Sequence, residues 1–185
     1  MKKVVLIATV AALGIPFAAQ AENYVGVNVG SAKQKYSVAG NSGSERDTAA
    51  KIYAGASLDK NFGVELGYAD FGRANKSFSN GNTISANSNA FYIAATATAP
   101  INDQFAVFAK LGVTANRSKI SVTSPTGSGS TKRNNTDALI GVGASYALSK
   151  DLSAVVEYEN FGKVAKSGGD SVKAEMYSVG LRYKF

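Results

Sequence analysis

Four charged residues stand out because they interrupt segments of otherwise small or apolar residues. They are Glu65, Lys110, Glu157 and Arg182. Each lies in a stretch where every second residue is apolar, and each takes the parity opposite to the apolar one. Charges of both signs on a face withdrawn from water must compensate one another, since an isolated buried charge is costly. We therefore predict an internal ion-pair cluster, with Glu65 pairing with Lys110 or Arg182.

Most catalytic chemistry is excluded by composition. The chain has no His and no Cys, which removes Ser-His and Asp-His arrangements, Cys nucleophiles and His or Cys metal sites. Glu157 and Glu159 remain as paired carboxylates for acid-base work. Two acids that share one face of a strand are more often salt-bridge partners, and we favour that interpretation. We predict a protein that is not an enzyme and needs neither metal nor cofactor.

The elements that position these residues are strands. The last thirteen residues, KAEMYSVGLRYKF, alternate apolar or aromatic residues with small or charged ones, and the same period recurs upstream. The alternation predicts strands at residues 24–36, 48–58, 62–71, 88–99, 105–118, 136–148, 152–161 and 173–185. Three tight turns at 59–61, 100–103 and 149–151 alternate with four long polar segments at 37–47, 72–87, 119–135 and 162–172. This order predicts an all-β, eight-stranded antiparallel up-and-down barrel.

A weak internal repeat supports equivalent hairpins in the two halves. A shift of 90 residues places Leu58, Lys60, Tyr68, Phe71 and Gly72 on Leu148, Lys150, Tyr158, Phe161 and Gly162.

The N-terminus is typical of an export signal. Lys2 and Lys3 precede an apolar run, and Ala19-Gln20-Ala21 forms a small-x-small cleavage motif. We predict that residues 1–21 are a cleaved signal peptide and that 22–185 form one barrel domain. The formal net charge of +7 is too mild to indicate nucleic-acid binding.

Alternation alone does not say which face is outside. The face opposite the apolar one is rich in Gly, Ser and Thr with few charges, so it fits the filled interior of a small barrel better than a solvated surface. The apolar face then meets lipid, with Tyr68, Tyr146, Tyr158, Tyr177 and Tyr183 in interfacial girdles. A soluble periplasmic ligand-binding barrel is the less favoured alternative.

Several short motifs resemble the eight-stranded outer-membrane barrels typified by the OmpA transmembrane domain and OmpX. They are Tyr24 to Gly30, Gly63 to Tyr68 with Phe71-Gly72-Arg73, Phe108 to Gly112, Tyr146 to Leu148, and Arg182 to Phe185. The resemblance implies a transmembrane barrel and a terminal Tyr183 and Phe185 signal that the barrel assembly machinery reads. It also implies that Glu65 and Lys110 match charged lumen positions. Asn28, Ser145 and Val155 replace charged residues of the family, so its gating scheme does not carry over directly.

The functional expectation is a small, monomeric barrel of the bacterial outer membrane, with long loops outside the cell and both termini in the periplasm. We predict a lumen plugged by salt bridges and a structural role in adhesion or envelope integrity; the alternative is a narrow, porin-like ion channel. Arg117, Lys119, Lys132 and Arg133 around the third loop would contact phosphates of lipopolysaccharide or anionic host surface molecules, or would simply be solvated. Membrane lipid is the remaining expected partner.

Overall fold

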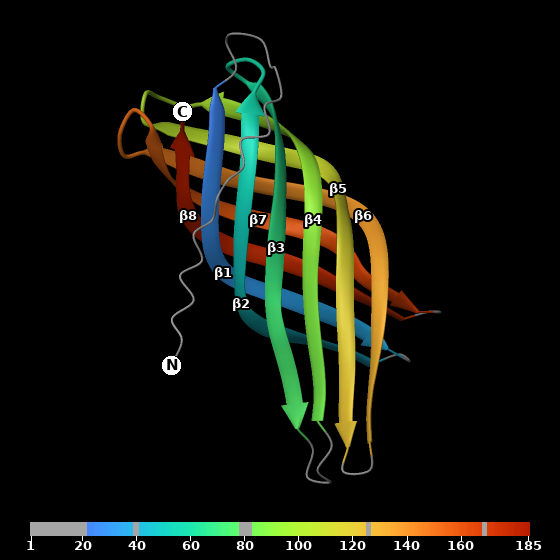
Figure 1. The fold of residues 1–185 in the computed structure, drawn as a ribbon. Coiled ribbons are helices and arrows are strands. Elements are labelled where there is room, and N and C mark those ends of the chain that lie inside the picture. The colour runs from blue at the N-terminus through green and yellow to red at the C-terminus, as the bar shows by residue number, and fades with distance from the viewer. Residues whose placement is uncertain (1–21, 39–40, 78–82, 125–126, 168–169) are drawn as a thin grey trace.

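The computed structural model describes residues 22–38, 41–77, 83–124, 127–167 and 170–185, so the predicted signal peptide lies outside the described residues. The eight predicted strands are confirmed, each pairs antiparallel with the next, and β8 pairs with β1 to close the barrel (Figure 1). The strands are β1 (Asn23–Val38), β2 (Asn41–Ser57), β3 (Phe62–Ser77), β4 (Thr83–Pro100), β5 (Phe105–Ser124), β6 (Gly127–Ala147), β7 (Leu152–Ser167) and β8 (Asp170–Lys184). No helix in these ranges is long and apolar enough to cross a membrane.

The apolar face points outward, as predicted. Leu111 is 65% exposed whereas its neighbour Lys110 is 2% exposed, and the same alternation runs along every strand. Leu66, Val142 and Leu181 are all exposed, and Glu65 is buried. Tyr24, near the start of β1, is buried in the interior. A sheet with this polarity is stable only when lipid covers its outer wall.

The three short turns share one hydrogen-bonding scheme. Asp59 Oδ1 accepts from the N–H groups of Asn61 and Phe62, both at 2.7 Å. Asn102 Oδ1 does the same for Gln104 and Phe105, and Ser149 Oγ for Asp151 and Leu152. A side-chain oxygen that satisfies two turn amides fixes the register of each hairpin. We call this end of the barrel the turn rim, and the opposite end the hairpin rim.

The polar segments predicted as loops are mostly strand. Residues 119–124 and 127–135, for example, pair in register from Lys119↔Lys132 to Ser124↔Gly127. Their polarity arises because both faces leave the barrel wall, so neither face needs to be apolar. The prediction of four long loops was therefore wrong, and with it the contrast between short and long connections, although the three tight turns lie where they were predicted.

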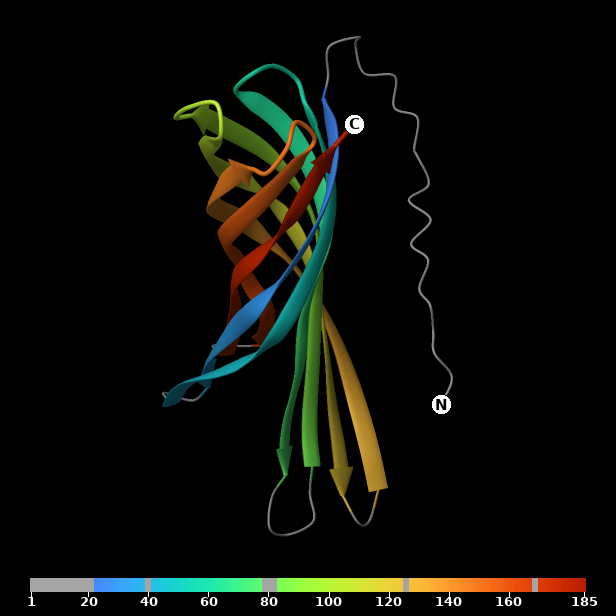
Figure 2. The same cartoon turned by 90° about the vertical axis from the view of Figure 1, so that its left-hand side faces the viewer.

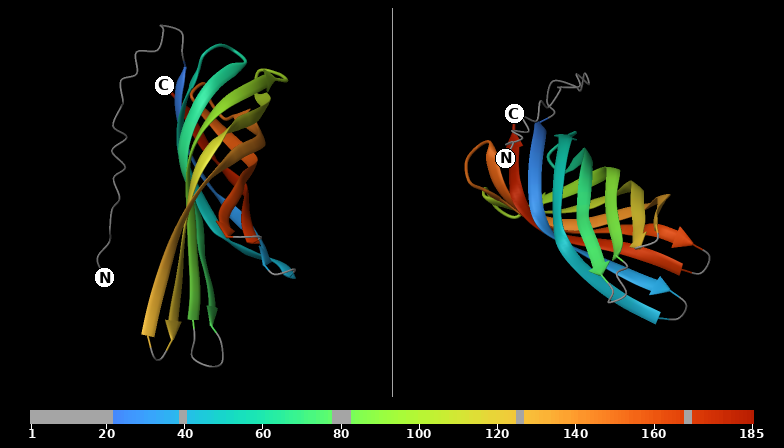
Figure 3. Two further views of the ribbon diagram at one scale, coloured as in Figure 1. Left: turned by 90° about the vertical axis from the view of Figure 1, so that its right-hand side faces the viewer. Right: turned by 60° about the horizontal axis from the view of Figure 1, so that its bottom comes forward.

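Toward the hairpin rim, the sheet divides into two four-stranded arms. Pairing between β2 and β3 ends at Ala50↔Asp70, and pairing between β6 and β7 ends at Ile140↔Asn160. The strands β3 to β6 stay paired beyond these points, and so do β7, β8, β1 and β2. Figures 2 and 3 show the two arms diverging from the common barrel.

Each point where the sheet divides lies beside a β-bulge, and the two bulges occupy equivalent positions in the internal sequence repeat. In β3, Phe71 and Gly72 together oppose one residue of β4, and Phe161 and Gly162 do the same against β8. Gly72 (φ 80°) donates to Asp70 Oδ1 at 2.8 Å, and Gly162 (φ 65°) donates to Asn160 Oδ1 at 2.9 Å. Phe71 and Phe161 keep the inward parity of their strands, and their rings meet edge to face in the lumen with centroids 4.8 Å apart.

We predict that Gly72→Ala destabilises the barrel by about 1–3 kcal/mol, because the positive φ is strained for Ala. The added Cβ would also lie 2.6 Å from the carbonyl oxygen of Thr48. Urea unfolding in vesicles, followed by the heat-sensitive gel mobility of the barrel, measures the change. Gly129→Ala is the matched control, since nothing lies within 4 Å of a Cβ placed there. Equal stability of the two variants would contradict a strained bulge.

We also predict a pH dependence from Asp59. The two N–H donors hold the pKa of this exposed carboxyl below its usual value of 3.8. The stabilisation is therefore present above about pH 4 and is lost as the pH falls through the lowered folded-state pKa. Asp59→Asn keeps the acceptor oxygen, as Asn102 shows in the next turn, and should flatten the unfolding midpoint below pH 4. Asn102→Ala should lower the midpoint by the same amount at every pH; a pH-dependent loss would contradict the assignment.

Candidate functional site

Six charged side chains fill the middle of the lumen. They come from five strands: Lys51 (β2), Glu65 (β3), Lys110 (β5), Glu157 and Glu159 (β7), and Arg182 (β8). Three carboxylates thus face three cations, and the cluster has no net charge. Neutrality matters because each ion has lost its water, and only good mutual geometry repays that cost.

Two lysines connect the carboxylates. Lys110 Nζ lies 2.6 Å from Glu65 Oε1, 3.1 Å from Glu157 Oε1 and 3.6 Å from Glu159 Oε1. Lys51 Nζ contacts Glu157 Oε2 and lies 2.6 Å from Glu159 Oε2. Because ammonium groups donate in three directions, each lysine links strands on opposite sides of the lumen.

Arg182 closes the cluster on the side of the turn rim. Its Nη2 atom lies 3.6 Å from Glu157 Oε1 and 3.9 Å from Glu65 Oε2. The guanidinium lies over the rings of Tyr24 and Phe108, 4.6 and 4.9 Å from their centroids. Its side chain is 12% exposed, more than those of the two lysines. Arg182 is therefore the member nearest to water.

Tyrosines complete the hydrogen bonding of Glu65. Tyr24 donates to Oε2 at 3.1 Å and Tyr92 donates to Oε1 at 2.7 Å. Both rings have room because the facing wall residues are Gly55 and Gly67, whose places for a Cβ the rings occupy. Glu65 is thus held by side chains from four strands besides its own: β1, β4, β5 and β8.

On the side of the hairpin rim, an apolar layer and then a polar layer cover the cluster. The apolar layer is the Phe71 and Phe161 pair, against which Tyr92 packs with a centroid distance of 6.0 Å. Above it, Ser88 bonds Ser118 at 2.9 Å and Gln34 at 3.5 Å. Along its axis, the lumen is therefore filled first by ions, then by rings, then by hydroxyl and amide groups.

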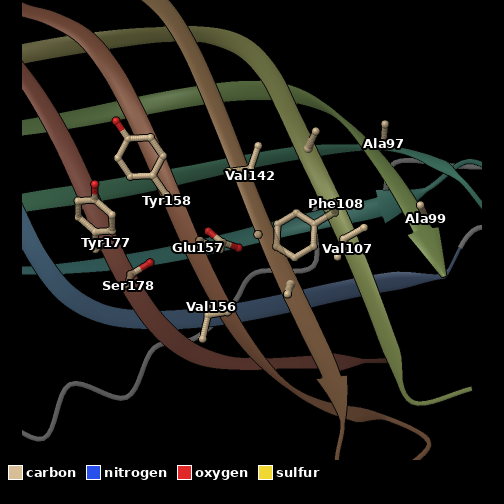
Figure 4. A pocket seen from close by; sticks show the side chains of 13 residues that line it. Ala97, Ala99, Val107, Phe108, Val142, Val156, Glu157, Tyr158, Tyr177 and Ser178 are labelled. Atoms are coloured by element: carbon tan, nitrogen blue, oxygen red, sulfur yellow. The ribbon is translucent and has the colours of Figure 1, made fainter. Parts of the chain in front are cut away.

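An open groove of about 760 Å³ crosses the outer wall (Figure 4). Its lining is mostly outward and apolar, including Val107, Val142 and Val156. The rings of Tyr158 and Tyr177 lie side by side and tilted, with centroids 4.7 Å apart. The groove is open along the apolar outer wall and differs from the enclosed pockets that hold most small ligands.

A family model for the OmpA-like transmembrane domain matches residues 18–185. The chain belongs to the OmpA-like transmembrane domain family. The barrel is thus an outer-membrane barrel of bacteria, as its lipid-facing wall indicates.

Solved structures share the fold of this OmpA-like barrel. Ail of Yersinia pestis, in a complex with the heparin analogue sucrose octasulfate, is 18% identical with a TM-score of 0.58, over 88% of this chain and 99% of Ail. Neisserial surface protein A is 17% identical with a TM-score of 0.64, over 88% and 97%. The N-terminal barrel domain of Pseudomonas aeruginosa OprF is 14% identical with a TM-score of 0.53, over 90% and 100%. A comparison with curated protein sequences found no match.

The OmpA-like barrel brings Glu65, Lys110, Glu157 and Arg182 together, within the contacts given above. Lys51 and Glu159 belong to the same cluster but were not included in the predicted set. The parity of the strands already placed both on the inner face, so a charge balance over all inward positions would have found them. Glu157 and Glu159 share Lys51, the arrangement expected of salt-bridge partners.

The four basic residues predicted around the third loop do not form one group. Arg117 and Lys119 lie on β5 and Lys132 on β6, all exposed and on the outward face. Arg133 pairs with Ser118, whose side chain is buried, and so lies on the opposite face. The segment is a regular ladder, in which neighbouring residues point to opposite sides. The predicted contact of the four residues with phosphates stays a prediction.

Tyr183 and Phe185 both lie at the turn rim. Tyr183 is half exposed on the outward face of β8, between Val25 and Leu152. Phe185 is 69% exposed, and its N–H donates to the carbonyl of Asn23 at 3.0 Å. The end of the chain is therefore fixed to β1 while its aromatic ring stays accessible.

We predict that Glu157→Ala is strongly destabilising, by about 3–5 kcal/mol, because it leaves Lys51 and Lys110 with excess buried charge. Glu157 contacts all three cations of the cluster. Glu22→Ala is the control: it breaks an exposed pair with Lys184 and should cost about 0–1 kcal/mol. Urea unfolding in vesicles measures both. A cost for Glu157→Ala as small as that for Glu22→Ala would show that the cluster is well hydrated.

Proposed function

We propose that this OmpA-like barrel is a non-enzymatic protein of the bacterial outer membrane, with a closed lumen and a structural and surface-interaction role in adhesion or envelope integrity. The observation that carries the proposal is the neutral cluster of six charges across the lumen. An ion entering this layer would have to displace a partner from at least one buried ion pair. The Phe71 and Phe161 rings add an apolar layer behind it.

The same side chains support the proposal that the barrel is not an enzyme. With no His or Cys in the chain, the carboxylates are the remaining candidates for acid-base chemistry. Glu65, Glu157 and Glu159 are all held by lysines in the buried cluster. A carboxylate held in this way has no open side from which a substrate could be approached.

The surface role is supported by the two arms. They extend the barrel with strands whose outer faces are polar, and we propose that they face the outside of the cell while both termini lie in the periplasm. Residues 1–21 would act as the export signal, and Tyr183 and Phe185 as the signal for barrel assembly. Ail, which shares the fold, was crystallised with a heparin analogue. A similar arrangement here would present the arms to anionic surface molecules of a host.

A narrow ion channel is the second candidate. Glu65 contacts both Lys110 and Arg182, so a change of partner would shift charge along the lumen without leaving Glu65 unpaired. Such an exchange, together with displacement of the Phe71 and Phe161 rings, would open a path.

Planar-bilayer recording separates the two candidates. We predict no discrete conductance steps for the wild-type protein, because the ion-pair and aromatic layers both block the lumen. Glu65→Ala removes one of the six charges and should remain closed, since the other ion pairs and the rings persist. The double variant Phe71→Ala/Phe161→Ala removes the rings and leaves the ions in place, so it should also show no conductance steps. Regular steps in the wild-type protein would establish the channel instead.

Deletion of the chain tests the surface role. We expect loss of adhesion to host cells or increased permeability to large antibiotics, restored by the wild-type chain expressed in trans. A strain that differs from its parent in neither assay would contradict the structural and adhesive role, whatever the conductance.

A further inference from the structure

The outward face of the strands changes character toward the hairpin rim. On β5 the exposed residues run Val113, Ala115, Arg117 and Lys119, and on β6 the exposed Ile140 is followed toward the rim by Asn134 and Lys132. The outer wall thus passes from apolar to basic within a few residue pairs. Each pair of residues advances about 7 Å along a strand.

The strand register aligns this change across one half of the barrel. Tyr68, Phe91, Ala115 and Thr136 are cross-strand neighbours and form the last row with outward aromatics. The next row places Asp70 beside Asn89, and Asn89 beside Arg117 and Asn134. The row beyond places Asn87 beside Lys119 and Lys132. Three cations and one acid therefore lie one and two rows beyond the aromatic residues, on the outward face just past the lipid-facing wall.

A groove of about 420 Å³ joins the two kinds of surface. Its lining includes the aromatic rings of Tyr68 and Phe91, the guanidinium-bearing Arg117, and the amides of Asn89 and Asn134. Arg117 Nε lies 3.4 Å from Asn134 Oδ1, so the side chain is directed along this wall. An apolar floor with cationic and amide walls fits a ligand that is both acylated and phosphorylated.

The other half of the barrel repeats the pattern. Beyond the outward rings of Tyr158 and Tyr177, Lys33 neighbours Arg46 and Glu175, and Lys173 neighbours Lys163 in the next row. Basic residues outnumber acids on the outward rows of both halves. At the turn rim the charges are mixed instead, with Asp59, Lys60, Asp103, Lys150 and Asp151.

We propose that these outward basic residues form a belt that binds the phosphate groups of anionic glycolipids in the leaflet at the hairpin rim, with one headgroup held in the groove at Arg117. The belt is defined by Lys33, Arg46, Arg117, Lys119, Lys132, Lys163 and Lys173. The proposal rests on the orientation given under the proposed function. It commits to membrane lipid and not to a soluble glycan, because the cations continue the lipid-facing wall directly above its aromatic rows.

The test uses the full barrel in phosphatidylcholine nanodiscs containing about one-fifth diphosphorylated lipid A. Native mass spectrometry counts the lipid A molecules that remain bound after detergent release. We expect the triple variant Arg117→Gln/Lys119→Gln/Lys132→Gln to retain at least threefold less lipid A than the wild-type barrel. The matched control Lys60→Gln/Lys150→Gln/Lys184→Gln removes the same charge at the turn rim and should retain as much as the wild type.

A second arm needs no variant. Enzymatic removal of both phosphates from the lipid A should lower its retention by the wild-type barrel to the level of the triple variant. Equal retention of the two lipids, or no loss in the triple variant, overturns the proposal. So does a result in which the triple variant loses binding of a soluble heparin fragment but keeps lipid A. None of these results affects the conductance test or the deletion test, so the proposed function is tested separately.

Discussion

The barrel depends on cancelling charge inside a lumen that excludes water. Eight strands enclose a space that side chains just fill, and six of those side chains are ionised in this protein. Three acids against three bases is the arrangement that avoids an uncompensated buried charge. Because the partners come from β2, β3, β5, β7 and β8, the same interactions that neutralise the lumen also hold opposite walls together. The remaining space around the ions is filled by aromatic rings, which pack against glycines in the facing wall.

The second organising feature is the repeated bulge. Two Gly residues with positive φ, related by the internal sequence repeat, directly follow the inward-facing Phe71 and Phe161. The same positions mark where β2 leaves β3 and β6 leaves β7. On β2 and β6, Asp47 and Asp137 stand beside the bulges, at places that a Cβ on either glycine would meet. One local motif, used twice, therefore caps the lumen and begins the separation of the arms.

Much of this architecture could be read from the residues. The alternation along the strands and the residues of the tight turns were sufficient to predict the barrel. The composition of the two faces was sufficient to predict that the apolar one points outward. Glu65, Lys110, Glu157 and Arg182 were accessible because parity puts them inside. Lys51 and Glu159 required a further step, since an inward charge says nothing about its partner until the register across strands is known. The extended hairpins could not be recognised, because a ladder with water on both faces lacks the apolar alternation by which a strand is identified. The same limitation hid the separation of Arg133 from Arg117, Lys119 and Lys132.

The separation of the two arms at the bulges has a consequence for how this surface can change. Beyond Asp70 and Asn160, the described residues show no strand pairing across the β2–β3 or β6–β7 boundary. The side chains of Asn135 and Asp137 on β6 bond the backbone of Lys163 on β7, close to the point of division. A residue inserted or lost at the tip of one hairpin shifts neither the stagger of the wall nor the ions inside it. The hairpins can therefore vary in length and sequence, while the membrane-embedded part keeps its register and its internal ion pairs.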